Sequence, residues 1–343
     1  MQAALITGRH RLELIEVPEP EPAPAGVVVD ITYCGICGTD IHAFQSGAPY
    51  NPAICGHEWV GTVSAAGAEV TAVAEGDRVV VAVPTPCGSC AACLVGRPES
   101  CTVVLGATLG RDMPGARHGG FASRLAVPAG RVVAAHPGLS DEQAAQVEPA
   151  TVSFHAVRRA GIRLGDTVAV QGAGPIGLLV AQWARVAGAG QVVVIEPDPA
   201  RRQLSDALGA TVSVAPDAGP EAVAERTGGL GADVVFECVG RPAAVQRAVD
   251  LTRRGGVMAL VGLADQDAPI TPRTWLVKEI TAVGSLAYDH RDFGLAMALI
   301  ADGRVALEPL HSSTVGLAGL SDTLGELAAG SSPLIKVLVD PRR

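Results

Sequence analysis

The segment Gly172–Gly177, with the sequence Gly-Ala-Gly-Pro-Ile-Gly, constrains the fold of this chain more than any other feature. It matches the pattern GxGxxG, which alone is weak evidence because glycine triplets arise often by chance. Here a predicted strand, Thr167–Gln171, precedes the pattern, and a predicted helix, Pro175–Ala187, follows it. In this context Gly172 permits the tight turn, Gly174 lets the backbone approach a pyrophosphate, and Gly177 lets helix and strand pack closely. We therefore expect a dinucleotide at the start of this helix.

Strands and helices alternate from about residue 155 onward. Continuous apolar runs separated by amphipathic stretches are typical of a parallel sheet covered by helices on both faces. Besides Thr167–Gln171, the expected strands are Gln191–Glu196, Asp233–Glu237 and Val257–Val261, and Ala200–Leu208 is a further expected helix.

The first 150 residues are expected to be rich in strands instead. Short β-branched runs bounded by Gly, Pro and Asp predict a partly antiparallel, barrel-like arrangement. These runs are Val27–Thr32, Glu58–Val63 and Arg78–Val83. Near the other end of the sequence, two helices and a strand exceed what one nucleotide-binding fold needs, and they could return to the first domain. They are expected at Asp292–Asp302, Leu320–Ala329 and Leu334–Val339.

A carboxylate at the end of the second expected strand bears on the choice of cofactor. Glu196 follows Gly177 by 19 residues, where it can accept hydrogen bonds from ribose hydroxyls and repel a 2′-phosphate. This favours NAD over NADP. Arg201 and Arg202 weaken the inference because an Arg can accommodate that phosphate. Alternatively, Glu196 is an ordinary solvated strand end.

Four cysteines on one loop form the strongest single signal of chemistry. The spacing Cys87-x2-Cys90-x2-Cys93-x7-Cys101 supplies four thiolates that can close a tetrahedron around Zn²⁺, with no position left for substrate. Such a site is structural. An iron–sulfur cluster, two disulfides or unrelated thiols are the alternatives, and zinc is favoured over them.

A second group of candidate ligands lies in Cys34-Gly-Ile-Cys37-Gly-Thr39-Asp40-Ile-His42 and in Gly56-His57-Glu58. Cys37, His57 and a carboxylate would give a zinc site with an open position for catalysis. Glu58 and Glu148 are both candidates for that carboxylate. Two other interpretations are a redox pair at Cys34 and Cys37, disfavoured because no βαβ unit starts there, and a His57 that merely fills the core.

The net charge and the distribution of apolar residues argue against a nucleic-acid-binding, secreted or membrane protein. The formal net charge of −9 and the lack of a basic patch argue against a nucleic-acid partner. The first residues do not resemble a signal peptide, and no apolar run is long enough for a membrane span. We expect a soluble, cytoplasmic protein.

Taken together, these motifs resemble those of the zinc-containing medium-chain dehydrogenase/reductase superfamily. The resemblance covers nearly the whole chain, through CGICGTDIH, GHEWVGTV, CGSCAACLVGRPESC, EPATVSFHAV, GAGPIG and KVLVDP. Glu148 stands where classical alcohol dehydrogenases carry Cys, so the chain is most similar to the branch of sorbitol, 2,3-butanediol and threonine dehydrogenases. The resemblance implies an α/β protein with two domains. They are a GroES-like, β-rich catalytic domain (1–153, completed by 290–343) and a doubly wound, parallel-sheet Rossmann domain that binds NAD (154–289).

The resemblance also implies roles for individual residues. Cys37 and His57 ligate the catalytic zinc, and Glu58 and Glu148 bind it directly, through water or in alternation. Asp40 orients His57. A proton relay runs from Thr39 to His42, although Thr39 could simply cap a helix. Residues that match positions near the nicotinamide, some of which could be mere strand ends, are Thr151, Val261, Leu263, Ser285 and Leu286.

These roles predict a dehydrogenase with two zinc ions per chain. A hydroxyl on zinc becomes acidic, and the resulting alkoxide transfers hydride to the nicotinamide, which interconverts a secondary alcohol or polyol and its ketone. One alternative is a dedicated biosynthetic dehydrogenase that acts on a cyclitol, sugar or nucleoside hydroxyl. Another is a non-catalytic relative, which the retained open zinc site disfavours. The resemblance further implies a homodimer or homotetramer.

Overall fold

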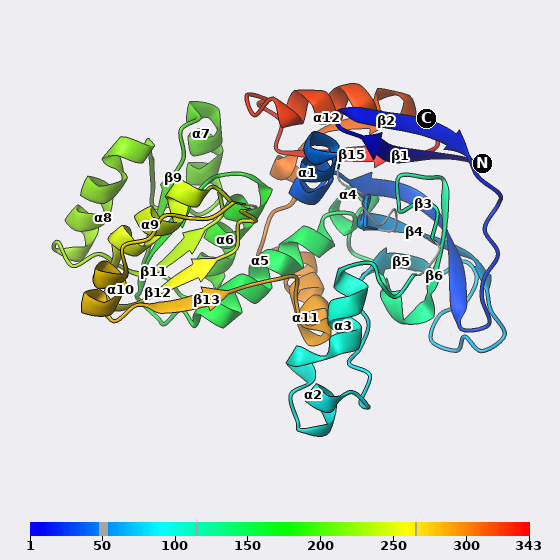
Figure 1. The fold of residues 1–343 in the computed structure, drawn as a ribbon, viewed down its shortest axis with the longest axis horizontal. Coiled ribbons are helices and arrows are strands. Elements are labelled where there is room, and N and C mark those ends of the chain that lie inside the picture. Colours follow the sequence, from blue (N-terminus) through cyan, green and yellow to red (C-terminus); the bar gives the residue numbers. More distant parts are fainter. Residues whose placement is uncertain (48–53, 114–115, 265) are drawn as a thin grey trace. The chain divides into compact units, whose positions relative to one another are not determined.

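The computed structural model describes residues 1–343 except 48–53, 114–115 and 265. The chain divides into two compact units (Figure 1). Unit 1 comprises Met1–Glu148, Asp289–Ala301 and Leu307–Arg343, and unit 2 comprises Pro149–Tyr288 and Asp302–Ala306. The sequence of unit 2 is therefore inserted into that of unit 1, and helix α5 (Val147–Ala160) begins in the one and continues in the other.

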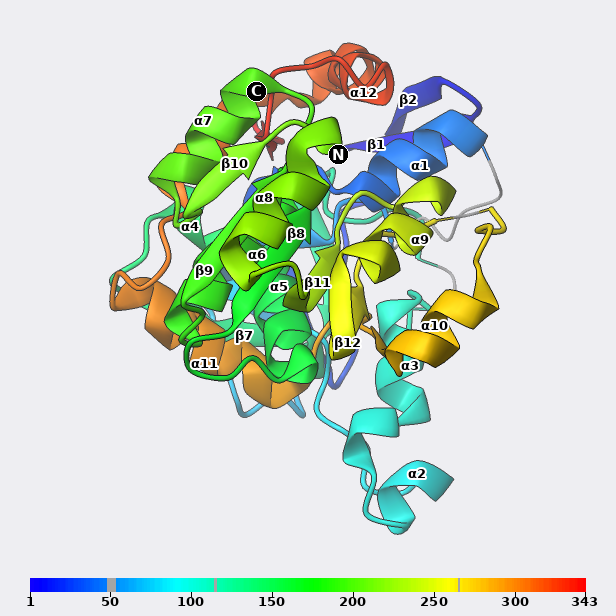
Figure 2. The same ribbon diagram turned by 90° about the vertical axis from the view of Figure 1, so that its left-hand side faces the viewer.

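Within its described residues, unit 2 is built on a six-stranded sheet with the strand order β10-β9-β8-β11-β12-β13. All neighbours pair in parallel. Helices α6, α8, α9 and α10 pack on these strands (Figure 2). The strands are β8 (Thr167–Gln171), β9 (Gln191–Ile195), β10 (Val212–Val214), β11 (Ala232–Glu237), β12 (Thr252–Leu260) and β13 (Thr281–Gly284). The helices are α6 (Pro175–Val186), α7 (Pro199–Ala207), α8 (Gly219–Thr227), α9 (Pro242–Leu251) and α10 (Pro272–Lys278).

The predicted parallel sheet is confirmed. Strand β8 has the expected bounds because strands buried on both faces read as unbroken apolar runs. Strand β12 begins at Thr252, five residues before the expected Val257, because the strand extends through an Arg-Arg-Gly-Gly segment that carries no apolar signal. The strand order reverses between β8 and β11, and ligands of such sheets bind outside the carboxyl ends of the strands at this point.

Unit 1 contains, in its described part, a seven-stranded mixed sheet with the path β14-β15-β3-β4-β5-β7, and β6 pairs with β3 off this path. Strands β1 and β2 form a separate hairpin. The strands are β1 (Gln2–Gly8), β2 (Arg11–Glu16), β3 (Gly26–Gly35), β4 (Glu58–Ala66), β5 (Arg78–Val81), β6 (Arg124–Pro128), β7 (Val132–Ala134), β14 (His311–Gly316) and β15 (Lys336–Asp340). The helices are α1 (Gly38–Ser46), α2 (Ala91–Leu94), α3 (Thr102–Thr108), α4 (Asp141–Ala144), α11 (His290–Ala301) and α12 (Leu320–Ala328).

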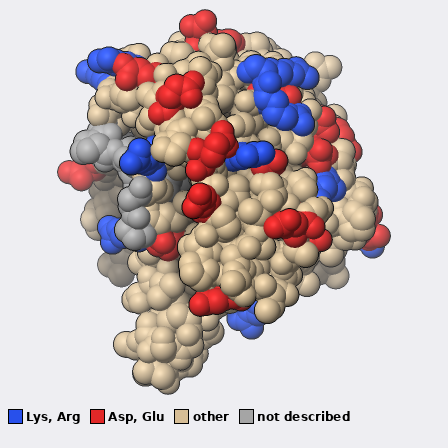
Figure 3. All heavy atoms as spheres, turned by 90° about the vertical axis from the view of Figure 1, so that its right-hand side faces the viewer, with Lys and Arg blue, Asp and Glu red and all other residues tan. Residues whose placement is uncertain are grey.

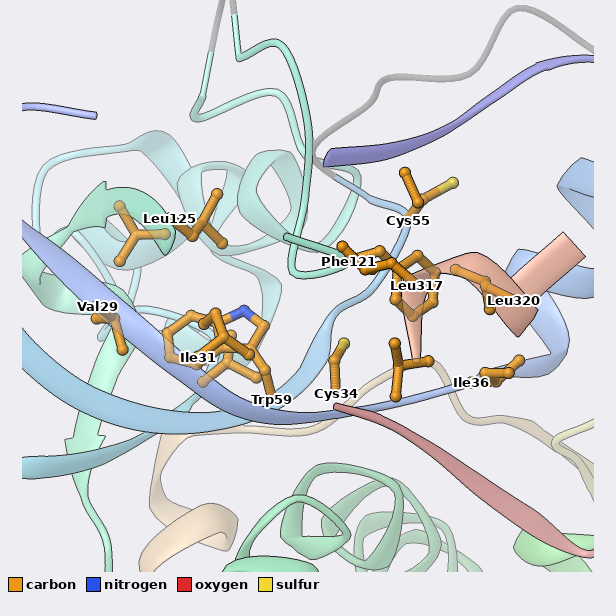
Figure 4. Packing of buried hydrophobic residues seen from close by; sticks show 14 of the residues in the cluster. Val29, Ile31, Cys34, Ile36, Cys55, Trp59, Phe121, Leu125, Leu317 and Leu320 are labelled. Carbon is orange, nitrogen blue, oxygen red and sulfur yellow. The ribbon is translucent and has the colours of Figure 1, made fainter. Parts of the chain in front are cut away.

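The core of unit 1 is closed by residues from both ends of the sequence (Figure 4). Ile31, Trp59 and Phe121 from the first part pack in one cluster with Leu317 and Leu320 from the last part. Strand β15 completes this closure because it pairs antiparallel with β3 and parallel with β14. The expected return of the last elements to the β-rich part of the chain is therefore observed.

Charged side chains do not gather into a basic patch on the face shown in Figure 3, where acidic and basic groups are interspersed. An example of such pairing in unit 1 is Arg124 on β6, whose Nε lies 2.9 Å from Oδ1 of Asp30, directly opposite it on β3. Along the described parts of the chain, no helix has the length and apolarity needed to cross a membrane.

A buried carboxyl group lies at the end of β11, where the strand order reverses. Glu237 is 0% exposed, and its Oε1 accepts hydrogen bonds from the backbone N–H groups of Val239 (2.8 Å) and Gly240 (2.9 Å). Its Oε2 is buried and has no hydrogen-bond partner among the described residues. Burial raises the pKa of Glu237, and the two backbone hydrogen bonds oppose that rise.

We predict that Glu237 makes the protein less stable as the pH rises above the ordinary glutamate pKa of 4.5. A carboxyl group with a raised pKa in the folded state favours folding while it is protonated, and this contribution is lost as the pH rises through the folded-state pKa. Glu237→Gln keeps the Oε1 acceptor but cannot ionise. Its melting temperature between pH 4.5 and pH 8 should therefore fall less than that of the wild type, whereas Glu225→Gln at an exposed site should behave as the wild type. An unchanged pH slope in Glu237→Gln would contradict this prediction.

Candidate active site and cofactor site

The first candidate ligand, Cys37, stands at the start of helix α1. It is the N-cap residue, with an extended backbone (φ −96°, ψ 158°). Its backbone N–H donates to Oδ2 of Asp40 at 2.8 Å, which fixes the turn between β3 and α1. Thr39 lies inside the helix and is not its cap, so that alternative is excluded.

The ring of His57 is oriented by a backbone carbonyl. Its Nδ1 lies 2.7 Å from the carbonyl oxygen of Ile54, an arrangement that leaves Nε2 available for a metal. This corrects the expectation that Asp40 orients His57. Asp40, 0% exposed, instead accepts hydrogen bonds from the backbone of Cys37 and, at 3.0 Å, of Gly56. It therefore ties together the two chain segments that carry the ligands.

The third candidate ligand, Glu58, opens strand β4. Glu58 is 1% exposed and lies opposite Gly35 in the antiparallel pair of β3 and β4. Ligand atoms of Cys37, His57 and Glu58 all lie within 4.8 Å of one another. The sheet pairing thus brings together two segments that are about 20 residues apart in the sequence. A thiolate, an imidazole and a carboxylate at this spacing suit zinc.

Sequence reasoning missed a lysine beside this group. Nζ of Lys336, on β15, donates to Oε2 of Glu58 at 2.6 Å and to the carbonyl of Ile36 at 2.9 Å. The side chains of Lys336 and Glu58 are 3% and 1% exposed. The motif KVLVDP was noted only as part of the resemblance. An apolar strand pattern interrupted by a lysine could have signalled a buried partner, because lysine is almost never fully buried unpaired.

The second candidate carboxylate, Glu148, stands in the first turn of α5. It does not belong to the group of ligand atoms within 4.8 Å, although His57, Glu58 and Lys336 influence it electrostatically. Burial raises the pKa of Glu148 to about 7, His57 opposes this rise, and the charge of Glu58 adds to it. The geometry of the described residues therefore brings Glu58, and not Glu148, next to Cys37 and His57.

The acidic groups around these candidate ligands favour the binding of a cation. Burial alone would lower the pKa of His57, but the Cys37 thiolate, Asp40 and Glu148 raise it well above its ordinary value. Burial would likewise lower the pKa of Lys336, but Glu58, Cys37 and Glu148 raise it. Several anionic groups thus converge in a desolvated space, an arrangement that is costly unless positive charge balances it. The residues fit a divalent metal ion.

The predicted relay residues both lie on α1. Oγ1 of Thr39 is 3.6 Å from Sγ of Cys37. His42 is three residues further along, so that the two side chains share one face of the helix. The structure places Thr39 at the metal ligands, and the relay itself stays a prediction.

The four cysteines of the loop Cys87–Cys101 converge as the spacing predicts. Their sulfur atoms all lie within 4.8 Å of one another. The backbone N–H of Cys90 donates to Sγ of Cys87 at 3.3 Å, and that of Cys87 to Sγ of Cys101 at 3.4 Å. Backbone hydrogen bonds from Cys93 and Thr102 lower the pKa of Cys90 to about 5. Preformed N–H···S contacts and an acidic thiol suit a Cys₄ zinc site. These cysteines are not paired in disulfides.

Cys34 and Cys55 lie outside both ligand groups. Both side chains belong to the apolar core of unit 1 (Figure 4), and they are 0% and 4% exposed. Burial raises the pKa of both thiols. Cys34 therefore acts as a core residue and not as the partner of Cys37 in a redox pair.

In unit 2, the glycine-rich turn connects β8 to α6 and has the geometry that the sequence predicts. Gly172 has a φ of +90°, which few other residues adopt. A Cβ at Gly177 would lie 1.9 Å from the carbonyl oxygen of Gly172, whereas a Cβ at Gly174 would meet nothing within 4 Å. Pro175 and Ile176 form the first turn of the helix. The open space at Gly174 is what the close approach of a pyrophosphate requires.

Glu196 lies at this turn and is not a solvated strand end. It is 6% exposed, and its carboxylate accepts hydrogen bonds from the backbone N–H groups of Ala173 (2.7 Å) and Asp198 (3.0 Å). Arg202 donates through Nη1 to the carbonyls of Glu196 and Pro197, each at 2.7 Å. Arg201 donates its backbone N–H to Asp198. The contacts of Arg202 thus tie its side chain to the backbone of the turn.

The residues predicted near the nicotinamide fall into two groups. Val261 and Leu263 follow β12, and Ser285 and Leu286 follow β13, so all four stand at the carboxyl ends of neighbouring parallel strands. Oγ of Ser285 is buried and has no hydrogen-bond partner in the described structure, and Leu286 is 63% exposed. Thr151 is fully buried on α5. An unpartnered hydroxyl at this edge of the sheet fits a polar cofactor.

Comparison with known proteins finds relatives that match nearly the whole chain. The family model for the alcohol dehydrogenase GroES-like domain matches residues 23–137, and that for zinc-binding dehydrogenase matches residues 175–302. The chain is 31% identical to sorbitol dehydrogenase of Bacillus subtilis (strain 168), covering 100% of this chain and 98% of that protein. It is 33% identical to 2-dehydro-3-deoxy-L-galactonate 5-dehydrogenase of Pseudoalteromonas atlantica, covering 99% and 98%. A solved structure of a zinc-binding dehydrogenase from Sinorhizobium meliloti 1021 bound to NADP is 31% identical, with a TM-score of 0.86 and coverage of 99% of both chains.

The glycine-rich turn generates a prediction from two matched substitutions. Gly174→Ala should leave the melting temperature within a few degrees of the wild type, because its Cβ meets no atom within 4 Å. It should nevertheless weaken dinucleotide binding, since the methyl group occupies the approach to the turn. Gly177→Ala should, unlike Gly174→Ala, lower the melting temperature, because its Cβ would collide with the carbonyl oxygen of Gly172. Calorimetric melting and titration with dinucleotide measure the two effects, and equal binding by Gly174→Ala and the wild type would contradict the assignment.

Proposed function

The chain belongs to the zinc-containing medium-chain dehydrogenase/reductase family, and from this premise we propose that it interconverts a secondary alcohol or polyol and its ketone with NAD(H) as cofactor. The family matches and the relatives named above are dehydrogenases that act on CH–OH groups. The observation that carries the proposal is the convergence of Cys37, His57 and Glu58 within 4.8 Å. Three protein ligands leave one tetrahedral position for a substrate oxygen.

Zinc held by Cys37, His57 and a glutamate would supply Lewis-acid chemistry, which makes an alcohol more acidic or polarises a carbonyl. The protein's own residues prepare the site for this chemistry. The Ile54 carbonyl fixes the tautomer of His57, and Asp40 fixes the backbone of Cys37 and Gly56. We propose that Thr39 accepts the substrate proton and that His42 passes it to solvent, since both occupy one face of α1.

NAD supplies the hydride acceptor when it is bound. We propose that its pyrophosphate lies on the turn Gly172–Gly177 and that Glu196 binds the ribose hydroxyls. Two features favour NAD over NADP: the carboxylate of Glu196 already lies at the turn, and Arg202 is tied to backbone carbonyls. A relative with this fold was solved with NADP bound, so Arg201 is the side chain to examine for contact with a 2′-phosphate.

Three further parts of the proposal concern the organisation of the protein. We propose that residues 1–153 with 290–343 form the catalytic domain and that 154–289 bind the dinucleotide. Each chain would hold two zinc ions, one catalytic and one structural at Cys87–Cys101. The family resemblance supports a homodimer or homotetramer.

The two zinc sites should respond differently to loss of a ligand. Cys37→Ser should lower activity by at least about 100-fold and remove one zinc per chain, while the melting temperature changes little. Cys93→Ser should instead reduce stability or folding yield, because a structural zinc contributes to folding. Cys55→Ala, a cysteine outside both groups, is the control and should retain two zinc ions.

Elemental analysis, thermal melting and the absorbance of reduced nicotinamide over a panel of secondary alcohols and polyols measure these outcomes. Full activity in Cys37→Ser would show that the catalytic assignment is wrong. A metal-replete protein that is silent on a broad panel would favour the dedicated biosynthetic dehydrogenase.

The role of Glu196 predicts a change in cofactor preference. Glu196→Gln removes the charge that would repel a 2′-phosphate, and it also weakens the hydrogen bonds to ribose hydroxyls. We expect kcat/KM with NAD to fall about 10- to 100-fold and the ratio of NAD to NADP efficiency to fall with it. Asp198→Asn, which keeps an N-cap acceptor, is the control. An unchanged ratio in Glu196→Gln would exclude Glu196 from cofactor selection.

A further inference from the structure

A buried ion pair at the candidate metal ligands, Lys336 with Glu58, takes no part in the proposed mechanism. Lys336 is one of only two lysines in the sequence, and the other, Lys278, lies in unit 2. Lys336 is 2% exposed, and its Nζ contacts Oε2 of Glu58 and the carbonyl of Ile36. A lysine enclosed to this extent requires a specific partner, and here the partner is a candidate zinc ligand.

We propose that Lys336 is a positioning residue for the catalytic metal: it holds Oε2 of Glu58 and so fixes the carboxylate of Glu58 beside Cys37 and His57. This inference rests on the proposed function, which assigns Cys37 and His57 to the same metal.

The sheet carries Lys336 to this position. Strand β15 pairs antiparallel with β3, with Leu338 opposite Gly35 and Val339 opposite Cys34. If the same register is continued beyond the paired residues, Lys336 lies opposite Cys37. The backbone N–H of Ile36 supports this register, because it donates to the carbonyl of Val337 at 3.0 Å. Lys336 is therefore fixed by the backbone pairing and not by a flexible loop.

Oε2 of Glu58 is enclosed from a second side by Gly35. A Cβ at Gly35 would lie 2.2 Å from Oε2 and 3.2 Å from Cβ of Glu58. The absence of a side chain at Gly35 thus provides the space in which this oxygen meets Lys336. Lys336 and Gly35 thus restrict the carboxylate of Glu58 from two sides.

Charge balance supports the same assignment. Zinc binding requires the thiolate form of Cys37. Cys37, Glu58 and Glu148 are all acidic groups that interact with Lys336, so Lys336 places a positive charge among them. Asp40 is also buried, but it accepts hydrogen bonds from two backbone N–H groups and lies behind the ligands. Hydrogen bonds to ligating residues commonly change metal affinity by 10- to 100-fold.

The test compares Lys336→Met with Lys336→Arg in the full-length protein, with Lys278→Met as the matched control. Lys278 also donates to backbone carbonyls, those of Val249, Asp250 and Thr252, but it lies far from the zinc ligands in the sequence and in the other unit. Competition with a chelator measures zinc affinity, and Co²⁺ substituted for the catalytic zinc reports the coordination by its visible absorption. We expect Lys336→Met to weaken the catalytic metal about 10- to 100-fold and to change the Co²⁺ spectrum. Lys336→Arg should largely restore both, and Lys278→Met should leave both as in the wild type.

A merely structural role for Lys336 is distinguished by combining variants. If Lys336 acts through Glu58, Glu58→Gln with Lys336→Met should bind zinc as Glu58→Gln alone does, because neither charge is then left without its partner. If Lys336 only holds β15 in place, the losses of the two single variants should add. Should Lys336→Met not fold, a folded double variant with the affinity of Glu58→Gln still supports the proposal, and failure of both to fold overturns it.

Gly35→Ala perturbs the same oxygen from its other side and should shift the Co²⁺ spectrum in the same direction as Lys336→Met. A wild-type spectrum and wild-type affinity in Lys336→Met would overturn the proposal. A wild type that binds both zinc ions but oxidises no alcohol would contradict the proposed function alone. A wild type that binds zinc only at Cys87–Cys101 would contradict both.

Discussion

The antiparallel pairing of β15 with β3 is the contact on which the rest of unit 1 depends. It joins a strand from the last part of the sequence to the strand that leads into Cys37. The pairing also buries Val337 and Val339 in the same core as Ile31 and Trp59. Backbone hydrogen bonds fix the register of β15 on β3, so the position of Lys336 beside Glu58 is fixed as well. Glu58 and Lys336 thus lie on paired strands, which hold them more precisely than loops would.

The two candidate zinc sites illustrate how different surroundings suit different tasks. The cysteines at Cys87–Cys101 lie on one short loop and gain N–H···S contacts from that same loop. Such a group can fold around its metal almost independently. Cys37, His57 and Glu58 come instead from two segments, at the start of α1 and at the start of β4, and they are held by Asp40, the Ile54 carbonyl and Lys336. A site with an open position needs this external support because its own ligands do not close the coordination shell.

The sequence was informative where the physical signal is local. The parallel strands of unit 2 are buried on both faces, so their apolar runs predicted β8 within its observed bounds. The cysteine spacing and the glycine pattern are equally local, and the structure brings their members together as expected.

The prediction failed where a contact depends on tertiary pairing. Lys336 is 278 residues from Glu58, and no spacing rule connects them. The prediction that Asp40 orients His57 was wrong for a similar reason. The group that contacts His57 Nδ1 is the backbone carbonyl of Ile54, and a backbone atom cannot be recognised from the residue types. Cys34 resembled a candidate ligand by its spacing from Cys37, but the alternation of side chains along β3 turns it into the core.

The insertion of unit 2 into unit 1 has a consequence for how the protein is made. Unit 2 is nearly continuous in sequence, so it can fold as soon as residues 149–288 have left the ribosome. Unit 1 cannot, because β15 is synthesised only after the whole of unit 2. Until then β3 lacks its partner strand β15, and Glu58 lacks Lys336. The proposed catalytic site is therefore completed late in biosynthesis, long after Cys37 has been translated. The four cysteines of Cys87–Cys101 lie close together in the sequence and can converge much earlier.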